Sequence, residues 1–189
     1  QFQLAETYYE REEYLLAISE YDRLIRRMKN SSYVEDAFWR KTEAYCELSP
    51  DYRLEREMTD KALKYLYDFV DIYPNSKFLG DANARILEMR EKLARKLLES
   101  AKLYDTLREY ESATYYYDTV IADYSDTHLY ASARLGKAGN MIALERWAEA
   151  RELMNSIGIE GREDLTPKEI IKMKTLGAEI LAQAESSKN

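Results

Sequence analysis

Cys46 and His128 are the residues of this chain whose types could support nucleophilic catalysis, and each is the single residue of its kind. A Cys–His nucleophile needs the two side chains within hydrogen-bond reach of each other. Cys46 lies in the helical run FWRKTEAYCEL without a nearby histidine, so we interpret it as a buried structural thiol. Acidic residues are spread at the spacing of helix surfaces, and no glycine-rich phosphate loop occurs. The sequence therefore predicts a protein that is not an enzyme, with no catalytic residue, no metal site and no cofactor.

The composition favours a helical protein that does not bind nucleic acid. Charged residues make up 33% of the 189 residues, with only 6 glycines and 3 prolines. The formal net charge of −7 argues against a nucleic-acid partner, because such proteins usually present a basic face. No run of about 20 apolar residues occurs, so no transmembrane helix is predicted. The unusual feature is the number of tyrosines, which is 17.

Many of these tyrosines belong to a repeated pattern. An aromatic residue is followed after three positions by alanine and, four positions further on, by a larger side chain, as in Tyr14–Ala17–Tyr21, Tyr110–Ala113–Tyr117 and Trp147–Ala150–Met154. Another alanine stands twelve residues before each of these alanines, and a fourth, stretched copy ends at Ala62, Leu66 and Phe69. The pattern resembles the tetratricopeptide repeat, a helix–turn–helix of about 34 residues that buries its apolar face against its neighbours.

The sequence thus predicts an all-α fold, a tetratricopeptide-repeat superhelix of antiparallel helix pairs with a C-terminal capping helix. We expect residues 1–157 to form about four repeats, the first incomplete, and residues 158–189 to form a linker and the capping helix. Helices are expected at about 2–11, 13–29, 33–48, 58–73, 77–108, 110–124, 128–144, 146–156 and 167–186. The long helix is predicted from unbroken apolar periodicity, and the last one from a capping box at Thr166 and Glu169.

Two tyrosines do not fit the packing positions of the repeat. Ala113, Tyr117 and Val120 share one stripe of their predicted helix, whereas Tyr115 and Tyr116 point about 200° and 100° back from Tyr117. At least one of the two is expected on the surface. Because tyrosine combines apolar area with a hydroxyl group, we interpret both as candidate protein-binding residues.

Four further residues complete the candidate protein-binding set: Arg40, Lys41, Tyr9 and Tyr52. Arg40 and Lys41 lie on the first helix of a repeat. Tyr52 lies in the segment 47–60, which lengthens the turn of the second repeat. Inserted loops in repeat arrays often lie on a binding face.

The chain also resembles a particular family of repeat proteins. The run YPNSKFLGDANARILEMREKLARKLLESAKLY (73–104) and the later ADYSDT (122–127) are similar to the BamD family, and looser repeat matches extend the resemblance over residues 2–155. That family comprises tetratricopeptide lipoproteins of the machinery that inserts β-barrel proteins into the bacterial outer membrane. The resemblance implies a scaffold on the periplasmic face of the cell outer membrane. Its anchor would be a lipidated cysteine preceding Gln1, the only membrane attachment expected.

The resemblance also implies the partners: the periplasmic domains of the barrel-inserting subunit, other assembly lipoproteins and unfolded outer-membrane protein segments. An alternative is another tetratricopeptide adaptor of the envelope or cytoplasm that binds peptide segments. A cell-division coordinator or a co-chaperone would be of this kind. A co-chaperone that binds carboxylate tails would need clustered basic residues in its groove.

Overall fold

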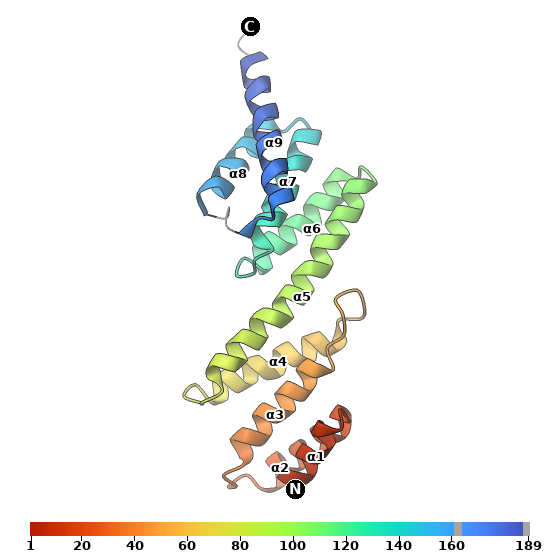
Figure 1. The fold of residues 1–189 in the computed structure, drawn as a ribbon, viewed down its shortest axis with the longest axis vertical. Helices are drawn as coiled ribbons and strands as arrows, with labels where there is room; N and C mark the ends of the chain where they lie inside the picture. Colours follow the sequence, from red (N-terminus) through yellow and green to blue (C-terminus); the bar gives the residue numbers. More distant parts are fainter. Residues whose placement is uncertain (161–163, 187–189) are drawn as a thin grey trace. The chain divides into compact units, whose positions relative to one another are not determined.

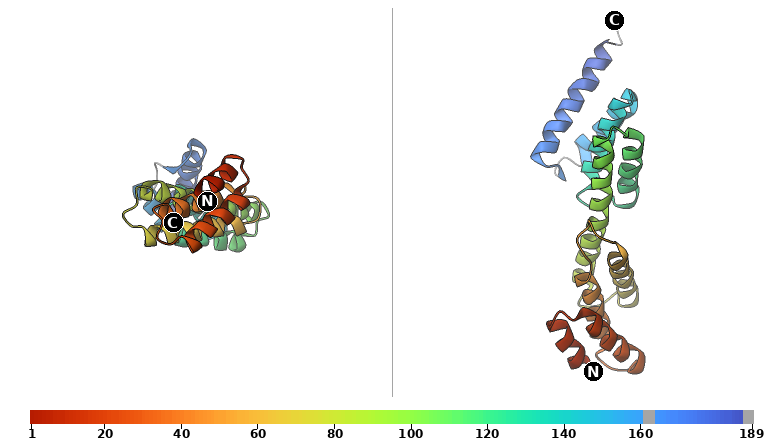
Figure 2. Two further views of the ribbon diagram at one scale, coloured as in Figure 1. Left: turned by 90° about the horizontal axis from the view of Figure 1, so that it is seen from below. Right: turned by 90° about the vertical axis from the view of Figure 1, so that its right-hand side faces the viewer.

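The regular elements of the protein are α-helices. The computed structural model describes the backbone of residues 1–160 and 164–186, and within these ranges it contains nine α-helices and no β-strand (Figure 1). They are α1 (Phe2–Glu10), α2 (Tyr14–Arg27), α3 (Val34–Glu47), α4 (Glu57–Ile72), α5 (Leu79–Thr106), α6 (Tyr110–Asp123), α7 (Tyr130–Ala143), α8 (Trp147–Glu160) and α9 (Pro167–Ser186). The successive helices form antiparallel pairs (Figures 1 and 2), which confirms the predicted all-α, tetratricopeptide-like fold.

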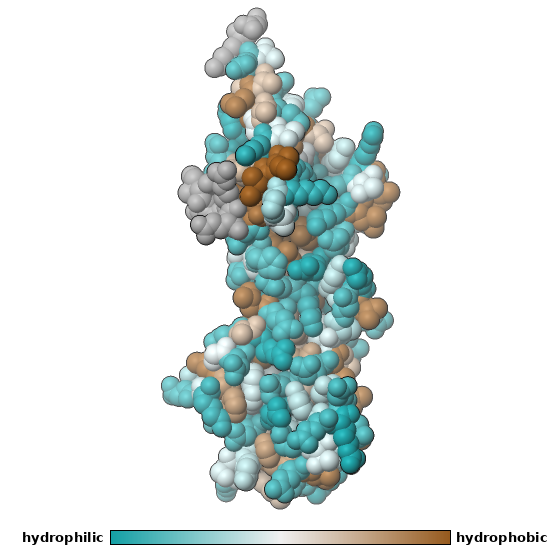
Figure 3. All heavy atoms as spheres, in the orientation of Figure 1, coloured by the Kyte–Doolittle hydropathy of each residue, from teal (hydrophilic) through white to brown (hydrophobic). Residues whose placement is uncertain are grey.

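The chain divides into two compact units, residues 1–93 and 94–189, with the boundary inside α5. In the first unit, α2 packs between α1 and α3, and α3 also packs on α4. In the second unit, α7 packs on both α6 and α8, and α9 contacts α7 and α8. On the face drawn in Figure 3, the described residues are mostly hydrophilic, and apolar side chains gather in separate patches.

Small residues mark the helix crossings of both units, as the repeat pattern predicts. Ala17, Ala113 and Ala150 are completely buried. The alanines twelve positions before them, Ala5, Ala101 and Ala138, are completely buried as well. The larger partners Tyr21 and Tyr117 fill the cores beside these alanines. This burial confirms the packing register assigned from the sequence.

The long helix and the last helix agree with the prediction. Helix α5 is continuous over 28 residues, including the whole of 82–105. Helix α9 begins after a capping box, in which Oγ1 of Thr166 accepts a hydrogen bond from the N–H of Glu169 at 3.3 Å and the Glu169 carboxylate accepts from the N–H of Thr166 at 2.9 Å. One boundary differs, because α8 extends to Glu160 instead of ending near residue 156. The expected linker is correspondingly shorter, and its residues 161–163 lie outside the described part.

The turns within three helix pairs share a strained backbone. Glu12, Arg108 and Glu145 have φ of 60°, 62° and 61°, in the left-handed region that favours glycine. After each, the next N–H bonds to a carbonyl five residues back, as from Glu109 to Tyr104 at 3.0 Å. This is the Schellman arrangement, which satisfies carbonyl groups at the end of a helix.

Candidate protein-binding surfaces

The tyrosines of α6 separate into one core residue and two residues of a surface cluster. Tyr117 is buried, whereas Tyr115 is 69% exposed, which confirms that at least one of the pair Tyr115 and Tyr116 lies on the surface. The ring of Tyr116 stacks on Tyr104 of α5, with centroids 5.3 Å apart and planes inclined by 14°. Tyr115 then meets Tyr116 edge-on at 5.5 Å. We refer to Tyr104, Tyr115 and Tyr116 as the tyrosine cluster.

The tyrosine cluster is held in place before any partner binds. Stacked and edge-to-face aromatic pairs contribute roughly 0.5–1.5 kcal/mol each beyond the area they bury. The nearby phenol of Tyr104 raises the pKa of Tyr116, so this hydroxyl stays protonated and able to donate at neutral pH. The cluster therefore presents an apolar ring with hydroxyl groups at low entropic cost. Its role in binding stays a prediction.

Arg40 is engaged inside the first unit. Its Nε and Nη2 donate to the two carboxylate oxygens of Glu6 on α1 at 2.9 and 2.8 Å, and its Nη1 donates to Glu43 at 3.1 Å. The guanidinium group lies 4.3 Å from the ring centre of Tyr9. Burial, with the nearby Glu43 carboxylate, raises the pKa of Tyr9 to about 12. Tyr9 and Arg40 thus form one partly buried cluster that ties α3 to α1.

Lys41 is only 5% exposed, so the structure does not present it to a partner as a surface cation. Its ammonium group pairs with Asp22 of α2 at 3.0 Å and lies 4.2 Å from the ring centre of Tyr65. Lys137 and Asp118 make the same kind of pair between α7 and α6. From the sequence alone, a lysine is expected on the surface. The signal that could have identified its role is the recurrence of this Asp–Lys pair at equivalent positions of two repeats.

Tyr52 lies in the segment between α3 and α4. The guanidinium group of Arg53 lies 4.9 Å from its ring centre, and the side chain is partly buried. The base of this segment is fixed, since Ser49 and Thr59 share a buried hydrogen bond of 2.8 Å and Nζ of Lys92 donates to the Ser49 carbonyl at 3.3 Å. Whether Tyr52 contacts a partner stays a prediction.

The structure places Cys46 in the core of the first unit, which confirms the interpretation from its sequence context. It packs with Trp39, Leu66 and Phe69. Burial raises the pKa of its thiol to about 12, so the reactive thiolate is scarce at neutral pH. Among the described residues, no cluster of three or more histidine, cysteine or acidic side chains could hold a metal ion. No helix in the same ranges is both long and apolar enough to cross a membrane.

Comparison with known proteins identifies relatives of the chain. The family model described as YfiO, outer membrane lipoprotein, matches residues 1–152. The outer membrane protein assembly factor BamD of Caulobacter vibrioides is 30% identical over 92 residues. These residues make up 49% of this chain and 30% of that relative, so the match spans less than a third of the relative's length.

Proposed function

This chain belongs to the YfiO family of outer membrane lipoproteins, and we propose that it acts as a non-enzymatic scaffold in the assembly of outer-membrane β-barrel proteins. The family match over residues 1–152 supports this role, as does the name of the Caulobacter relative, an outer membrane protein assembly factor. Paired helices leave many side chains partly exposed, and such a surface suits a protein that binds other proteins. In this proposal the chain works at the periplasmic face of the outer membrane, held there by a lipid anchor.

The proposed partner surface is the tyrosine cluster of the second unit, and the proposed partner is the periplasmic part of the barrel-inserting subunit. The observation that carries this assignment is the 69% exposure of Tyr115 above a stacked tyrosine pair. Large aromatic side chains on rigid elements are typical hot spots of protein interfaces. Leu103 of α5 and Leu107, in the turn after α5, add exposed apolar area in the same unit.

The first unit offers a second kind of surface, suited to unfolded outer-membrane protein segments. A cavity of about 390 Å³ is lined by the aromatic rings of Phe2, Trp39 and Phe78, with charged groups of Asp36 and Arg40 at its wall. Mixed apolar and charged walls fit an extended segment that carries both kinds of side chain. Other assembly lipoproteins complete the proposed partners.

The test is a binding measurement with the purified periplasmic domains of the barrel-inserting subunit. Tyr115→Ala should weaken binding at least about tenfold, which corresponds to about 1.4 kcal/mol. Tyr67→Ala is the matched control, because Tyr67 is an exposed tyrosine of the first unit and should leave binding unchanged. Both variants should unfold like the parent chain, since neither removes a buried side chain.

Two outcomes would contradict the proposal. If the parent chain does not bind the periplasmic domains, the scaffold function with this partner is wrong. If the parent binds and Tyr115→Ala binds equally well, the partner contact lies elsewhere and the tyrosine cluster serves the packing of α5 and α6.

A further inference from the structure

Helix α9 lies on the outside of the second unit, against α7 and α8 (Figures 1 and 2). It has 20 residues, of which Leu176 and Ile180 are buried, whereas α7 buries eight of its 14 residues. Two of its large apolar side chains, Ile171 and Leu181, are 66% and 67% exposed. Between residues that the structure describes, no ion pair joins α9 to another helix. The last helix is therefore attached to its unit less extensively than α7 is.

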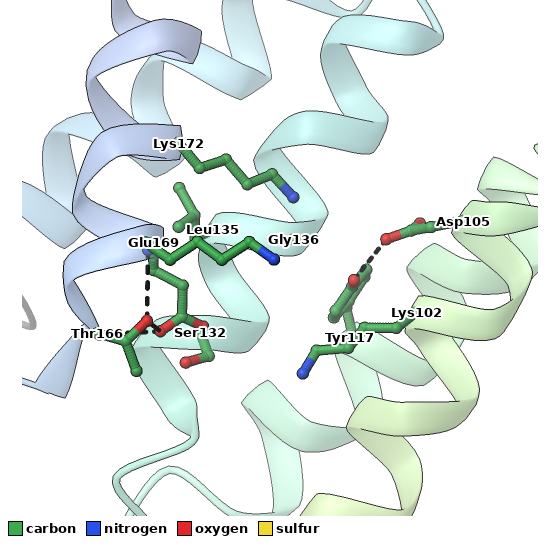
Figure 4. Close-up of a pocket in the computed structure, with 10 residues that line it drawn as sticks. Lys102, Asp105, Tyr117, Ser132, Leu135, Gly136, Thr166, Glu169 and Lys172 are labelled. Atoms are coloured by element: carbon green, nitrogen blue, oxygen red, sulfur yellow. Dashed lines mark hydrogen bonds between the residues drawn. The ribbon is translucent and has the colours of Figure 1, made fainter.

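The contact between α9 and α7 is also incompletely filled. A cavity of about 430 Å³ lies between α5, α7 and α9, and its lining includes Leu135 of α7 and Lys172 of α9 (Figure 4). Protein interiors are close-packed, because a gap removes dispersion contacts from the atoms that border it. At the first turn of α9, the carboxylate of Glu169 meets Ser132 of α7 (Figure 4). Much of the attachment of α9 therefore rests on a few apolar side chains.

These apolar side chains follow one stripe along α9. Ile170, Met173 and Leu176 pack in one cluster, and Ile180, one turn further on, packs in a second. Spacings of three and four residues place side chains on the same face of a helix. The residues that receive the stripe come from α7 and α8, and we refer to them as the α7–α8 groove: Leu135, Met141, Ile142, Ala150, Met154 and Ile157.

We propose that α9 is a displaceable occupant of the α7–α8 groove, and that an amphipathic helix of a partner protein competes with it. Docking of an amphipathic helix into an apolar groove is a common mode of recognition. The seated α9 shows what the competing helix carries, which is a stripe of large apolar side chains spaced by three or four residues. Met141 and Met154 allow the groove to adapt to a different set of such side chains.

The competition sets the affinity of the groove for a partner. Because α9 belongs to the same chain, a partner helix binds only the fraction of molecules in which α9 is undocked. None of the groove residues belongs to the tyrosine cluster, so the two surfaces are separate. The inference does not depend on the proposed scaffold function.

Hydrogen exchange of the full parent chain tests whether α9 undocks by itself. We expect the amides of α9 to exchange together and at least about tenfold faster than those of α7, because undocking leaves the hydrogen bonds within α7 intact. If the amides of α9 and α7 are equally protected, α9 is an integral part of the unit and the proposal is overturned.

Competition is measured with a fluorescein-labelled peptide of residues 164–186, added to the full chain and followed by fluorescence anisotropy. The tethered α9 competes at a high effective concentration, so the parent chain should bind the peptide weakly. The double change Leu176→Ala and Ile180→Ala in the chain weakens its own α9 and should tighten binding of the peptide at least about tenfold. A peptide that itself carries these two changes should bind neither protein.

The matched control is the double change Ile171→Ala and Leu181→Ala in the chain, because it shortens two exposed side chains of the same helix. This variant should bind the peptide as weakly as the parent does. The proposal is wrong if the Leu176→Ala, Ile180→Ala chain binds no more tightly than the parent, or if the control binds as tightly as that variant. It is also wrong if α7 and α8 lose their exchange protection in that variant, since α9 is then required to form the groove.

Discussion

The phenol of Tyr117 donates a hydrogen bond of 2.6 Å to the carboxylate of Asp105, joining α6 to α5. Tyr21, at the same position of another repeat, donates to Glu6 between α2 and α1. Burial and the accepting carboxylate raise the pKa of both phenols, so each remains a donor at neutral pH. Each bond lets a large buried ring keep its polar atom satisfied, which is a general condition for burying tyrosine.

Truncation of Tyr117 should separate the contribution of the ring from that of the hydroxyl. We expect Tyr117→Ala to lower the free energy of unfolding by about 3–5 kcal/mol, as for large aromatic residues in cores. Tyr117→Phe keeps the ring but removes the hydroxyl that donates to the Asp105 carboxylate, and should cost about 1–3 kcal/mol. Urea unfolding measures both, with Tyr115→Ala as a control expected to change stability by less than about 0.5 kcal/mol. A Tyr117→Phe variant as stable as the parent would show that the hydrogen bond adds nothing.

Enlarging the alanine at a helix crossing should destabilise the second unit. Ala113 is completely buried beside Tyr117 and Val120. Ala113→Leu should therefore overpack the site and cost about 1–3 kcal/mol in unfolding free energy. Ala122→Leu makes the same change at an exposed position of α6 and should stay within about 0.5 kcal/mol of the parent. Equal stabilities of the two variants would contradict the assigned register.

The Arg40–Glu6 pair should make stability depend on pH in the acidic range. Burial alone would raise the pKa of Glu6, but hydrogen bonds from Arg40 and Tyr21 outweigh it and hold the pKa below the ordinary value of 4.5. A lowered carboxyl pKa stabilises the folded state above the unfolded-state pKa, and this stabilisation is lost as the pH falls through the folded-state pKa.

Arg40→Gln should therefore lower the free energy of unfolding at neutral pH, and the difference from the parent should shrink as the pH falls below 4.5. Chemical unfolding of both proteins over a series of pH values measures this difference in free energy. Arg11→Gln, at an exposed arginine outside this cluster, should show no such pH-dependent difference. A gap between parent and Arg40→Gln that is constant with pH would rule out the assigned role of Glu6.

The effect of a substitution at Arg108 on the free energy of unfolding should depend strongly on the new side chain, because this residue forms a left-handed turn. Its φ of 62° is adopted easily by glycine and poorly by β-branched residues. Arg108→Val should cost about 1–2 kcal/mol, whereas Arg108→Gly should be neutral or slightly stabilising. The same two substitutions can be made at Glu12, whose φ is 60° in the first unit, as a second test in the same protein. Urea unfolding measures the stability of all these variants. If valine and glycine are tolerated equally at both positions, the turns are not strained.

Features of the fold that are periodic in the sequence could be predicted from it. The nine helices, the buried alanines and the continuity of α5 follow from the spacing of small and apolar residues, which is local information. The C-terminal end of α8 could not be predicted from the sequence, since a glycine such as Gly158 usually indicates the end of a helix. The structure continues the helix to Glu160, after Ile157 is completely buried against Leu165 and Leu176. Tertiary packing there outweighs the roughly 1 kcal/mol that glycine costs a helix.

The candidate sites were harder to predict, because they depend on neighbouring helices. The exposure of Tyr115 follows from its angle on α6, whereas the burial of Lys41 depends on Asp22 and Tyr65, which other helices supply. The second unit also contains a cavity between α5, α7 and α9, and nothing in the spacing of Lys168 and Lys172 indicates that Lys102 lines the same cavity.

The burial of Cys46 means that the folded chain behaves toward thiol reagents almost as if it contained no cysteine. A fluorophore or a spin label could be attached to Tyr115→Cys at a single site without first removing the native thiol. The rate at which Cys46 itself is modified would then report how often the core around Trp39 and Phe69 opens. The modification rate of this one native thiol thus measures local unfolding of the first unit.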